Sequence, residues 1–175
     1  MSYTMVTHES FKLFKFWDEE YKTLNYVKEK FNDPATEIVW TDAGFRGPFG
    51  GYMCDMRSPQ PSWNSKFIDF FERYEHWKDI GTSYYRMDPG SSLPNHRDTY
   101  RKYIQIHNLQ GREHSIRRAV IFLEDRKPGH FAECQNTGYA EWSAGFTLIW
   151  PWDAEHSAFN MGFEPRYTLQ ITGHL

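Results

Sequence analysis

Two histidines and one aspartate in this 175-residue sequence have the residue types and spacing of a metal site. One residue separates His96 from Asp98, so in an extended segment both side chains project from the same face and can bind one ion. His156 lies sixty residues further along the chain and could supply the third ligand. The sequence therefore predicts a metal site formed by an H-x-D pair and a distant histidine.

The chemistry of this ligand set depends on the coordination positions that it leaves open. Two imidazoles and one carboxylate occupy one face of an octahedron, which leaves three positions for other groups. Iron(II) needs these positions to bind a bidentate oxo acid and then O2, whereas zinc rarely needs so many. Arg166 follows His156 by ten residues, and its planar guanidinium suits the distal carboxylate of 2-oxoglutarate. Thr168 shares a strand face with Arg166 and could add a hydrogen bond to the same co-substrate.

Two further residues are candidates for contact with the oxo acid. His107 shares an expected strand face with Tyr103 and Gln105. It could point toward the oxo acid or be a hydrogen-bonded interior histidine. Tyr84 and Tyr85 precede the H-x-D segment, and because neighbours in a strand face opposite ways, only one of them can face the site. We favour Tyr85, although core packing would explain either tyrosine.

The residues around His156 are candidates for the substrate pocket. Trp150, Trp152 and Phe159 flank this histidine and could wall a pocket, but aromatic side chains at a barrel mouth are also common in ordinary packing. Asn160 could contact substrate or tie a loop through its side chain. The sequence leaves these alternatives open.

Two other segments offer weaker signals. Arg112, Arg117 and Arg118 could receive a substrate carboxylate or lie in solvent, and we favour solvent. The glycine-rich segment from Gly44 to Gly51 has the permissive backbone of an active-site lid.

Several short motifs occur in the order found in one known family. They are the Pro89-Gly90 turn, His96, His107, the Trp142-Ser143-Ala144-Gly145 turn, the H-x-x-x-N run from His156 to Asn160, and Arg166. On these motifs, residues 82 to 173 resemble the aspartyl/asparaginyl β-hydroxylase branch of the 2-oxoglutarate/iron(II) oxygenases. The resemblance implies that the first and last histidines hold iron, that His107 contacts the co-substrate and that Arg166 binds its carboxylate.

The sequence departs from that family at three points. The β-hydroxylases usually have glycine at the acidic ligand position, whereas Asp98 keeps the complete triad seen in most of the superfamily. The run from Gly90 to Asp98 is also similar to the G-x-x-Y-x-x-H-x-D motif of prolyl 4-hydroxylases, but Leu93 and Met87 replace their tyrosines. Gln105 replaces an arginine often found before the family's second histidine. Neither prolyl nor acidic substrates are therefore implied.

The amino-terminal half is expected to be largely helical. Apolar residues at spacings of three, four and seven predict a helix from Phe11 to Phe31, ended by Asp33-Pro34. A broad aromatic stripe predicts a second helix from Ser62 to Lys78, with Ser62 as its cap. Between them, Glu37 to Trp40 is a strand candidate, and the glycines from 44 to 51 mark a loop.

The pattern changes after Gly81 to short, mostly alternating segments. The predicted strands are Ser83 to Met87, Arg101 to His107, Arg117 to Leu123, His130 to Cys134, Phe146 to Trp150, His156 to Phe159 and Arg166 to Thr172. They predict a mainly β fold, a double-stranded β-helix of about eight strands (a cupin-like jelly roll) with amino-terminal α-helices packed on it.

Composition narrows the class of protein. Aromatic residues make up 18% of the chain, which favours a β-rich fold with aromatic pockets. The net charge of -3 and the lack of a long basic run argue against nucleic acid as a partner. Two cysteines, Cys54 and Cys134, do not suggest a disulfide framework, and we expect no secretion signal and no membrane span. A cytoplasmic location fits these features.

The sequence thus predicts one oxygenase domain over residues 1–175, with a helical and lid segment at 1–80 and a catalytic core at 81–175. We expect it to hydroxylate a C–H bond of an amino acid, a peptidyl residue or a small metabolite, with Fe(II), 2-oxoglutarate and O2. The rival interpretations are a cupin-like metal- or ligand-binding domain without turnover and a zinc hydrolase. Formation of succinate from 2-oxoglutarate would discriminate between them.

Overall fold

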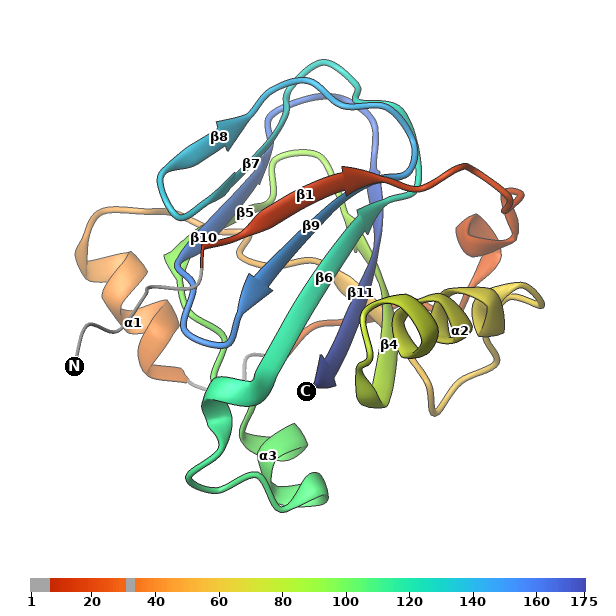
Figure 1. The fold of residues 1–175 in the computed structure, drawn as a ribbon. Coiled ribbons are helices and arrows are strands. Elements are labelled where there is room, and N and C mark those ends of the chain that lie inside the picture. The colour runs from red at the N-terminus through yellow and green to blue at the C-terminus, as the bar shows by residue number, and fades with distance from the viewer. Residues whose placement is uncertain (1–6, 31–33) are drawn as a thin grey trace.

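Two β-sheets form most of the structure (Figure 1). The computed structural model describes residues 7–30 and 34–175. The large sheet contains β1 (Glu9–Lys12), β2 (Val27–Lys28), β3 (Tyr52–Asp55), β4 (Lys78–Met87), β6 (Ile116–Phe122), β9 (Phe146–Pro151) and β11 (Arg166–His174). The small sheet contains β5 (Ser92–His96), β7 (His130–Cys134), β8 (Thr137–Tyr139) and β10 (His156–Asn160).

All pairings between these strands are antiparallel. The strand order is β1-β9-β6-β11-β4-β3-β2 in the large sheet and β5-β10-β7-β8 in the small sheet. From β4 onward the chain crosses repeatedly between the sheets, so the eight strands β4 to β11 supply four strands to each. The prediction of a mainly β jelly roll of about eight strands is confirmed.

Apolar side chains from both sheets meet between them. Phe122 and Trp150 of the large sheet pack in one cluster with Ala132 of the small sheet. Tyr85 of the large sheet packs in a second cluster with Leu93 of the small sheet. Because residues in a strand alternate between faces, these clusters identify the inner face of each strand.

The outer face of the large sheet is covered by α2 (Asn64–Tyr74). Phe67 and Phe71 of α2 are fully buried in the same cluster as Tyr84 and Leu169 of the sheet. The predicted helix from Ser62 to Lys78 is therefore confirmed with shorter bounds. Its expected cap is wrong, because the N-cap position is Trp63 and the Ser62 hydroxyl instead contacts the Glu20 carboxylate at 3.2 Å.

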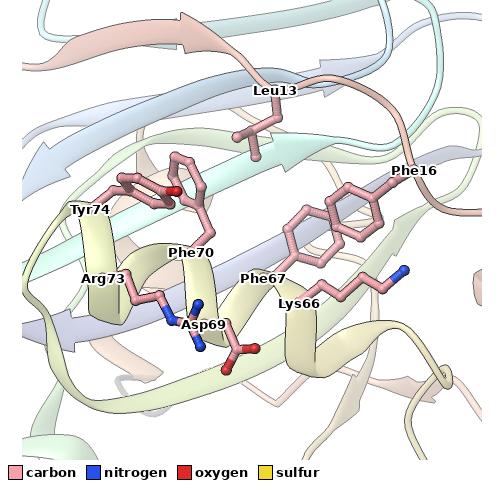
Figure 2. Close-up of a pocket in the computed structure, with 8 residues that line it drawn as sticks. All are labelled: Leu13, Phe16, Lys66, Phe67, Asp69, Phe70, Arg73 and Tyr74. Carbon is pink, nitrogen blue, oxygen red and sulfur yellow. The ribbon is translucent and has the colours of Figure 1, made fainter.

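A surface cavity of about 210 Å³ lies along α2. Figure 2 shows the Phe67 and Phe70 rings of the helix beneath Leu13 and Phe16, with Lys66 at the edge. Since α2 packs on the outer face of the large sheet, this cavity is separated by that sheet from the inner face.

The predicted helix from Phe11 to Phe31 is wrong over the residues that the structure describes. That region contains β1, a 3₁₀ helix (Glu20–Thr23) and β2, while Phe31 and Asp33 lie outside the described residues. Of the apolar residues on which that prediction rested, Trp17 and Tyr21 are buried but Phe14 is 88% exposed. Leu13 N–H donates to the Gly145 carbonyl at 2.9 Å instead of to a helical neighbour. The apolar residues in this region therefore have a helix-like spacing, but the chain that carries them is largely extended and packs in the core cluster under α2.

Two short predictions are also wrong. Residues Glu37 to Trp40 belong to α1 (Pro34–Asp42), which begins with proline, a residue favoured in the first helical turn. Residues Arg101 to His107 form α3, bounded by left-handed backbone at Tyr100 (φ 50°) and Asn108 (φ 53°). A seven-residue segment is too short for its apolar pattern to separate helix from strand.

The remaining predicted strands correspond to β4, β6, β7, β9, β10 and β11.

None of the described helices combines the length and apolar character needed to cross a membrane.

Candidate metal centre

His96, Asp98 and His156 come together at one end of the small sheet. His96 is the last residue of β5, Asp98 follows two residues later, and His156 is the first residue of β10. Because these antiparallel strands pair His96 with His156, the two ring centroids are only 4.4 Å apart. The candidate ligand atoms of the three side chains all lie within 4.8 Å of one another. The group can therefore hold a metal ion.

Backbone carbonyls orient both imidazoles. Nδ1 of His96 lies 2.8 Å from the Pro94 oxygen, and Nδ1 of His156 lies 3.1 Å from the Ala154 oxygen. A carbonyl only accepts, so each Nδ1 carries the hydrogen and each Nε2 keeps its lone pair. The two Nε2 atoms lie 3.9 and 3.8 Å from Oδ1 of Asp98. This is the tautomer and orientation that metal binding requires.

Asp98 is held from its other side by Arg118. Nη2 of this arginine lies 3.3 Å from Oδ2 of Asp98, and its Nη1 donates to Oε1 of Gln170 at 3.3 Å. Its guanidinium carbon also lies 5.2 Å from the centroid of the Tyr100 ring. Arg118 thus contacts Oδ2 of Asp98, while Oδ1 is the oxygen that faces the two histidines.

The charges of the group suit a metal at neutral pH. Burial raises the pKa of Asp98, but Arg118, His156 and His96 outweigh this effect and lower it to about 2. Burial lowers the pKa of His156 to about 4. At pH 7 the carboxylate is therefore ionised and His156 is neutral, which are the states that bind metals.

Arg166 is a buried cation without an acidic partner in the described ranges. It is the first residue of β11 and is 7% exposed. Its Nη1 donates to the Phe131 carbonyl at 2.8 Å, and its guanidinium carbon lies 5.9 Å from the centroid of the Phe122 ring. Burial lowers the pKa of Arg166 to about 10, so the side chain stays charged at pH 7. A buried cation of this kind is suited to bind a ligand carboxylate.

The distance from the metal group to Arg166 follows from the strand register. Phe131, which Arg166 contacts, pairs with Phe159 on β10, three residues from His156. At a rise of about 3.3 Å per residue, this places the contacted carbonyl about 10 Å from the histidine along the sheet. A small dicarboxylate could therefore reach both the metal group and the guanidinium.

Thr168 and Tyr85 lie beside Arg166 on the inner face of the large sheet. Thr168 pairs with Tyr85, and both side chains are buried. The Tyr85 hydroxyl donates to Oε2 of Glu29. Because a phenol has one hydrogen, Tyr85 cannot donate to an oxo acid while that bond is made. The structure thus brings Arg166, Thr168 and Tyr85 together, and the hydroxyl hydrogen of Tyr85 is given to Glu29.

His107 is not brought to this site. It lies on α3, where its ring packs 4.5 Å from the Tyr103 ring and its Nδ1 lies 3.7 Å from Oδ2 of Asp79. Asp79 is near the start of β4, whereas Arg166 pairs with Met87 at its end. From Asp79 to Met87 the chain advances by eight residues, which corresponds to about 26 Å of strand. The predicted contact of His107 with the co-substrate is therefore wrong, because it depended on a strand where the chain forms a helix.

The predicted substrate residues separate into different environments. The Trp150 ring centroid lies 4.8 Å from that of His156, so this side chain does line the metal group. Trp152 is 36% exposed in the turn after β9. Asn160 is fully buried, and both of its amide hydrogens are donated to the carbonyls of Met87 and Glu164 at 2.9 Å. Asn160 therefore ties the loop after β10, which corrects its prediction as a substrate contact.

Comparisons with known proteins bear on the fold. No family model and no curated protein matches the sequence. A prolyl-4-hydroxylase structure from Pseudomonas putida is similar with a TM-score of 0.56 and 14% identity, over 89% of this chain and 95% of that chain. A cupin domain from Bordetella pertussis has a TM-score of 0.42 and 14% identity, over 75% and 100% of the two chains.

The fold is a double-stranded β-helix. At these identities the likeness concerns the fold alone, and the resemblance to the aspartyl/asparaginyl β-hydroxylase branch stays a prediction. Within the double-stranded β-helix, the candidate ligands come from β10 and from the segment at the end of β5, and Arg166 comes from β11.

Two residues of the site were not found from the sequence. Arg118 was expected in solvent, but its side chain is largely buried beside Asp98. Arg118 and Phe122 lie an even number of positions apart on β6, so both side chains point to the inner face. The rest of β6 has apolar residues on both faces, so the sequence does not show which face is the inner one. Glu29 lies in a segment that was predicted as a helix, and no local pattern marks it.

Proposed function

We propose that this protein is an Fe(II)- and 2-oxoglutarate-dependent oxygenase that hydroxylates a C–H bond of an amino acid, a peptidyl residue or a small metabolite. The observation that carries the proposal is the buried, acid-free guanidinium of Arg166 on the inner face of the same barrel that holds the His96, Asp98 and His156 group. A metal-binding domain without turnover does not need such a cation, and neither does a zinc hydrolase.

The three candidate ligands fit iron(II) by their donor chemistry. Two neutral imidazoles and one carboxylate on a single face leave room for an oxo acid and O2. Asp98 would remain ionised through its contact with Arg118, and both histidines would offer Nε2. The proposed roles are therefore metal binding for the triad and positioning of Asp98 for Arg118.

Arg166 would bind the distal carboxylate of 2-oxoglutarate, with Thr168 beside it on β11. Trp150 would exclude water on the side of His156. When bound, iron with 2-oxoglutarate would activate O2, of which one atom would enter succinate as the oxo acid loses CO2 and the other would be inserted into the C–H bond. We propose that residues 81–175 carry this chemistry and that residues 1–80 cover the barrel, with a lid at 44–51.

The first experiment tests the metal and the co-substrate together. Iron(II) and 2-oxoglutarate, added without O2, should produce the weak visible absorption band of a chelated oxo acid. His156→Ala should abolish the band because it removes one of three protein ligands. If this variant keeps the band and the normal iron stoichiometry, the proposed triad is wrong.

The second experiment separates the oxygenase from its rivals. With iron(II), O2 and a panel of amino acids and short peptides, the wild type should form succinate together with a product that has gained one oxygen atom, measured by mass spectrometry. A binding domain would form no succinate. A zinc hydrolase would be active with zinc and indifferent to 2-oxoglutarate.

A further inference from the structure

One carboxylate at the inner surface has no part in the chemistry proposed above. Glu29 follows β2 at the edge of the large sheet, and its N–H donates to the Gly51 carbonyl at 2.9 Å. Its partly buried side chain accepts the hydrogen bond of Tyr85 through Oε2. Because Tyr85 is a buried residue of the inner face, this bond holds the carboxylate beside that face.

Packing relates Glu29 to the metal group, because its partner Tyr85 lies in one cluster with Trp40, whose ring centroid is 5.4 Å from that of His96. Burial is the main cause of the raised pKa of Glu29, and the charge of Asp98 raises it further while His96 lowers it. The charge of Glu29 in turn raises the pKa of Arg118. Since such effects weaken quickly with distance and solvent, they agree with the packing contact through Tyr85 and Trp40.

Glu29 lacks a cationic partner in the part of the chain that the structure describes. It forms no ion pair there, and the donors to its carboxylate are uncharged: the Tyr85 hydroxyl at Oε2 and the backbone N–H of Gly51. The neighbouring Lys28 donates to the Phe49 carbonyl at 2.7 Å and lies over the ring of Tyr52. The terminal nitrogens of Arg118 are engaged by Asp98 and Gln170. No cation of the described residues therefore pairs with this partly buried carboxylate, and its acceptor sites outnumber these two donors.

We propose that Glu29 binds a cationic group of the substrate, an ammonium or a guanidinium. The inference rests on the proposed function, in which Arg166 binds the anionic co-substrate and leaves Glu29 for the molecule that is oxidised. A substrate carboxylate at this position would be repelled, and a neutral group would leave a partly buried charge without a counter-charge. A cation would form a charge-assisted hydrogen bond with Oε1. The cation could belong to a free basic amino acid or to a basic residue in a peptide.

The test compares ligands that differ mainly in charge. Binding of L-arginine and of its neutral analogue L-citrulline is measured by calorimetry on protein containing iron(II) and 2-oxoglutarate without O2. L-Lysine and L-norleucine form a second pair, and a short blocked peptide containing arginine tests the peptidyl source. The wild type should bind at least one cation about tenfold or more tightly than its neutral analogue.

Glu29→Gln is the decisive variant. Glutamine is nearly isosteric and its amide oxygen still accepts the Tyr85 hydrogen bond, so the fold should be kept, as checked by circular dichroism. The preference for the cation should fall to about one. Glu37→Gln removes an exposed glutamate from α1 and should keep the wild-type preference. Tyr85→Phe keeps the carboxylate but removes its anchor, so it should keep part of the preference.

The outcomes separate this inference from the proposed function. Failure of both cations to bind the wild type, or an undiminished preference in Glu29→Gln, would overturn the cation site and show that Glu29 only connects β2 with β4. If the protein prefers cations but forms no succinate in the presence of O2, the cation site is supported and the proposed oxygenase activity is overturned. If it forms succinate without a preference for cations, the oxygenase activity is supported and the cation site is overturned.

Discussion

Arg118 and Asp98 form an ion pair in which Nη2 of the arginine lies 3.3 Å from Oδ2 of the carboxylate. The other oxygen, Oδ1, lies 3.9 Å from Nε2 of His96 and 3.8 Å from Nε2 of His156. The carboxylate is thus oriented before any metal binds, and the arginine that orients it comes from the large sheet on β6. Groups that orient metal ligands contribute strongly to metal affinity in proteins.

Arg118→Met should weaken iron binding by about 10- to 100-fold, because Asp98 loses the group that orients it and lowers its pKa. The measurement is an anaerobic iron(II) titration. Arg117→Met is the matched control, since this neighbour points to the other face and donates to the carbonyls of His114 and Ile116. Equal iron affinity in the two variants would show that Arg118 does not position the carboxylate.

Arg166 should contribute mainly to the affinity for 2-oxoglutarate. A charge-assisted pair is worth about 1.5–3 kcal/mol, so Arg166→Met should raise the dissociation constant roughly 10- to 150-fold. Arg166→Lys should lose less, because it keeps a charge but not the planar pair of donors. The dissociation constant of 2-oxoglutarate is measured from the iron-dependent absorption band. If it is unchanged in Arg166→Met, Arg166 does not bind the co-substrate.

Asp98 should decide between hydroxylation and halogenation. In the 2-oxoglutarate/iron(II) oxygenases that the sequence resembles, a glycine or alanine at the acidic position opens a coordination site that can accept halide, whereas this chain keeps the carboxylate. The wild type should therefore form hydroxylated and no chlorinated product in chloride buffer, as measured by mass spectrometry. Asp98→Gly should bind iron more weakly because one anionic ligand is lost. Chlorinated product from the wild type, or undiminished iron affinity in the variant, would exclude Asp98 as a ligand.

The metal-free protein should lose stability in mild acid. Unfolded His156 takes up a proton near pH 6.5, but the folded state keeps it neutral down to about pH 4 because of burial. The unfolded state therefore binds more protons in this window, and stability falls as the pH drops through it. The full contribution is on the order of 3 kcal/mol.

Urea unfolding of metal-free protein at pH 7 and pH 5 measures this effect. His156→Gln should show a smaller loss between the two pH values than the wild type, while His114→Gln, at an exposed position, should behave like the wild type. The same loss in all three proteins would mean that other groups are responsible.

Parts of the site could be predicted because their determinants are local. The H-x-D spacing places His96 and Asp98 on one side of a strand end, and the strand patterns that begin at His156 and at Arg166 are strong enough to be recognised. The helix at 64–74 was also predicted, because its apolar stripe is long enough to show the period of 3.6 residues.

The errors arose where tertiary contacts override a local pattern. The apolar spacing from Phe11 onward is helix-like, but the chain there is extended across the outer side of the large sheet. The segment from Arg101 to His107 alternates like a strand, but left-handed residues at both ends bound a helix instead. Because this segment is a helix and not a strand, His107 does not lie at the metal group, since the direction of a side chain depends on the element that carries it.

By itself, the sequence determined the eight-strand barrel and the identity and order of the candidate metal ligands and Arg166, because residue type, two-residue spacing and alternation are local properties. Only the tertiary structure decided that Arg118 turns inward to Asp98 and that Tyr85 of the inner face donates to Glu29. These partners lie 20 and 56 residues apart in the chain. Their contacts depend on sheet register and on the packing of β2 at the sheet edge, which local patterns do not encode.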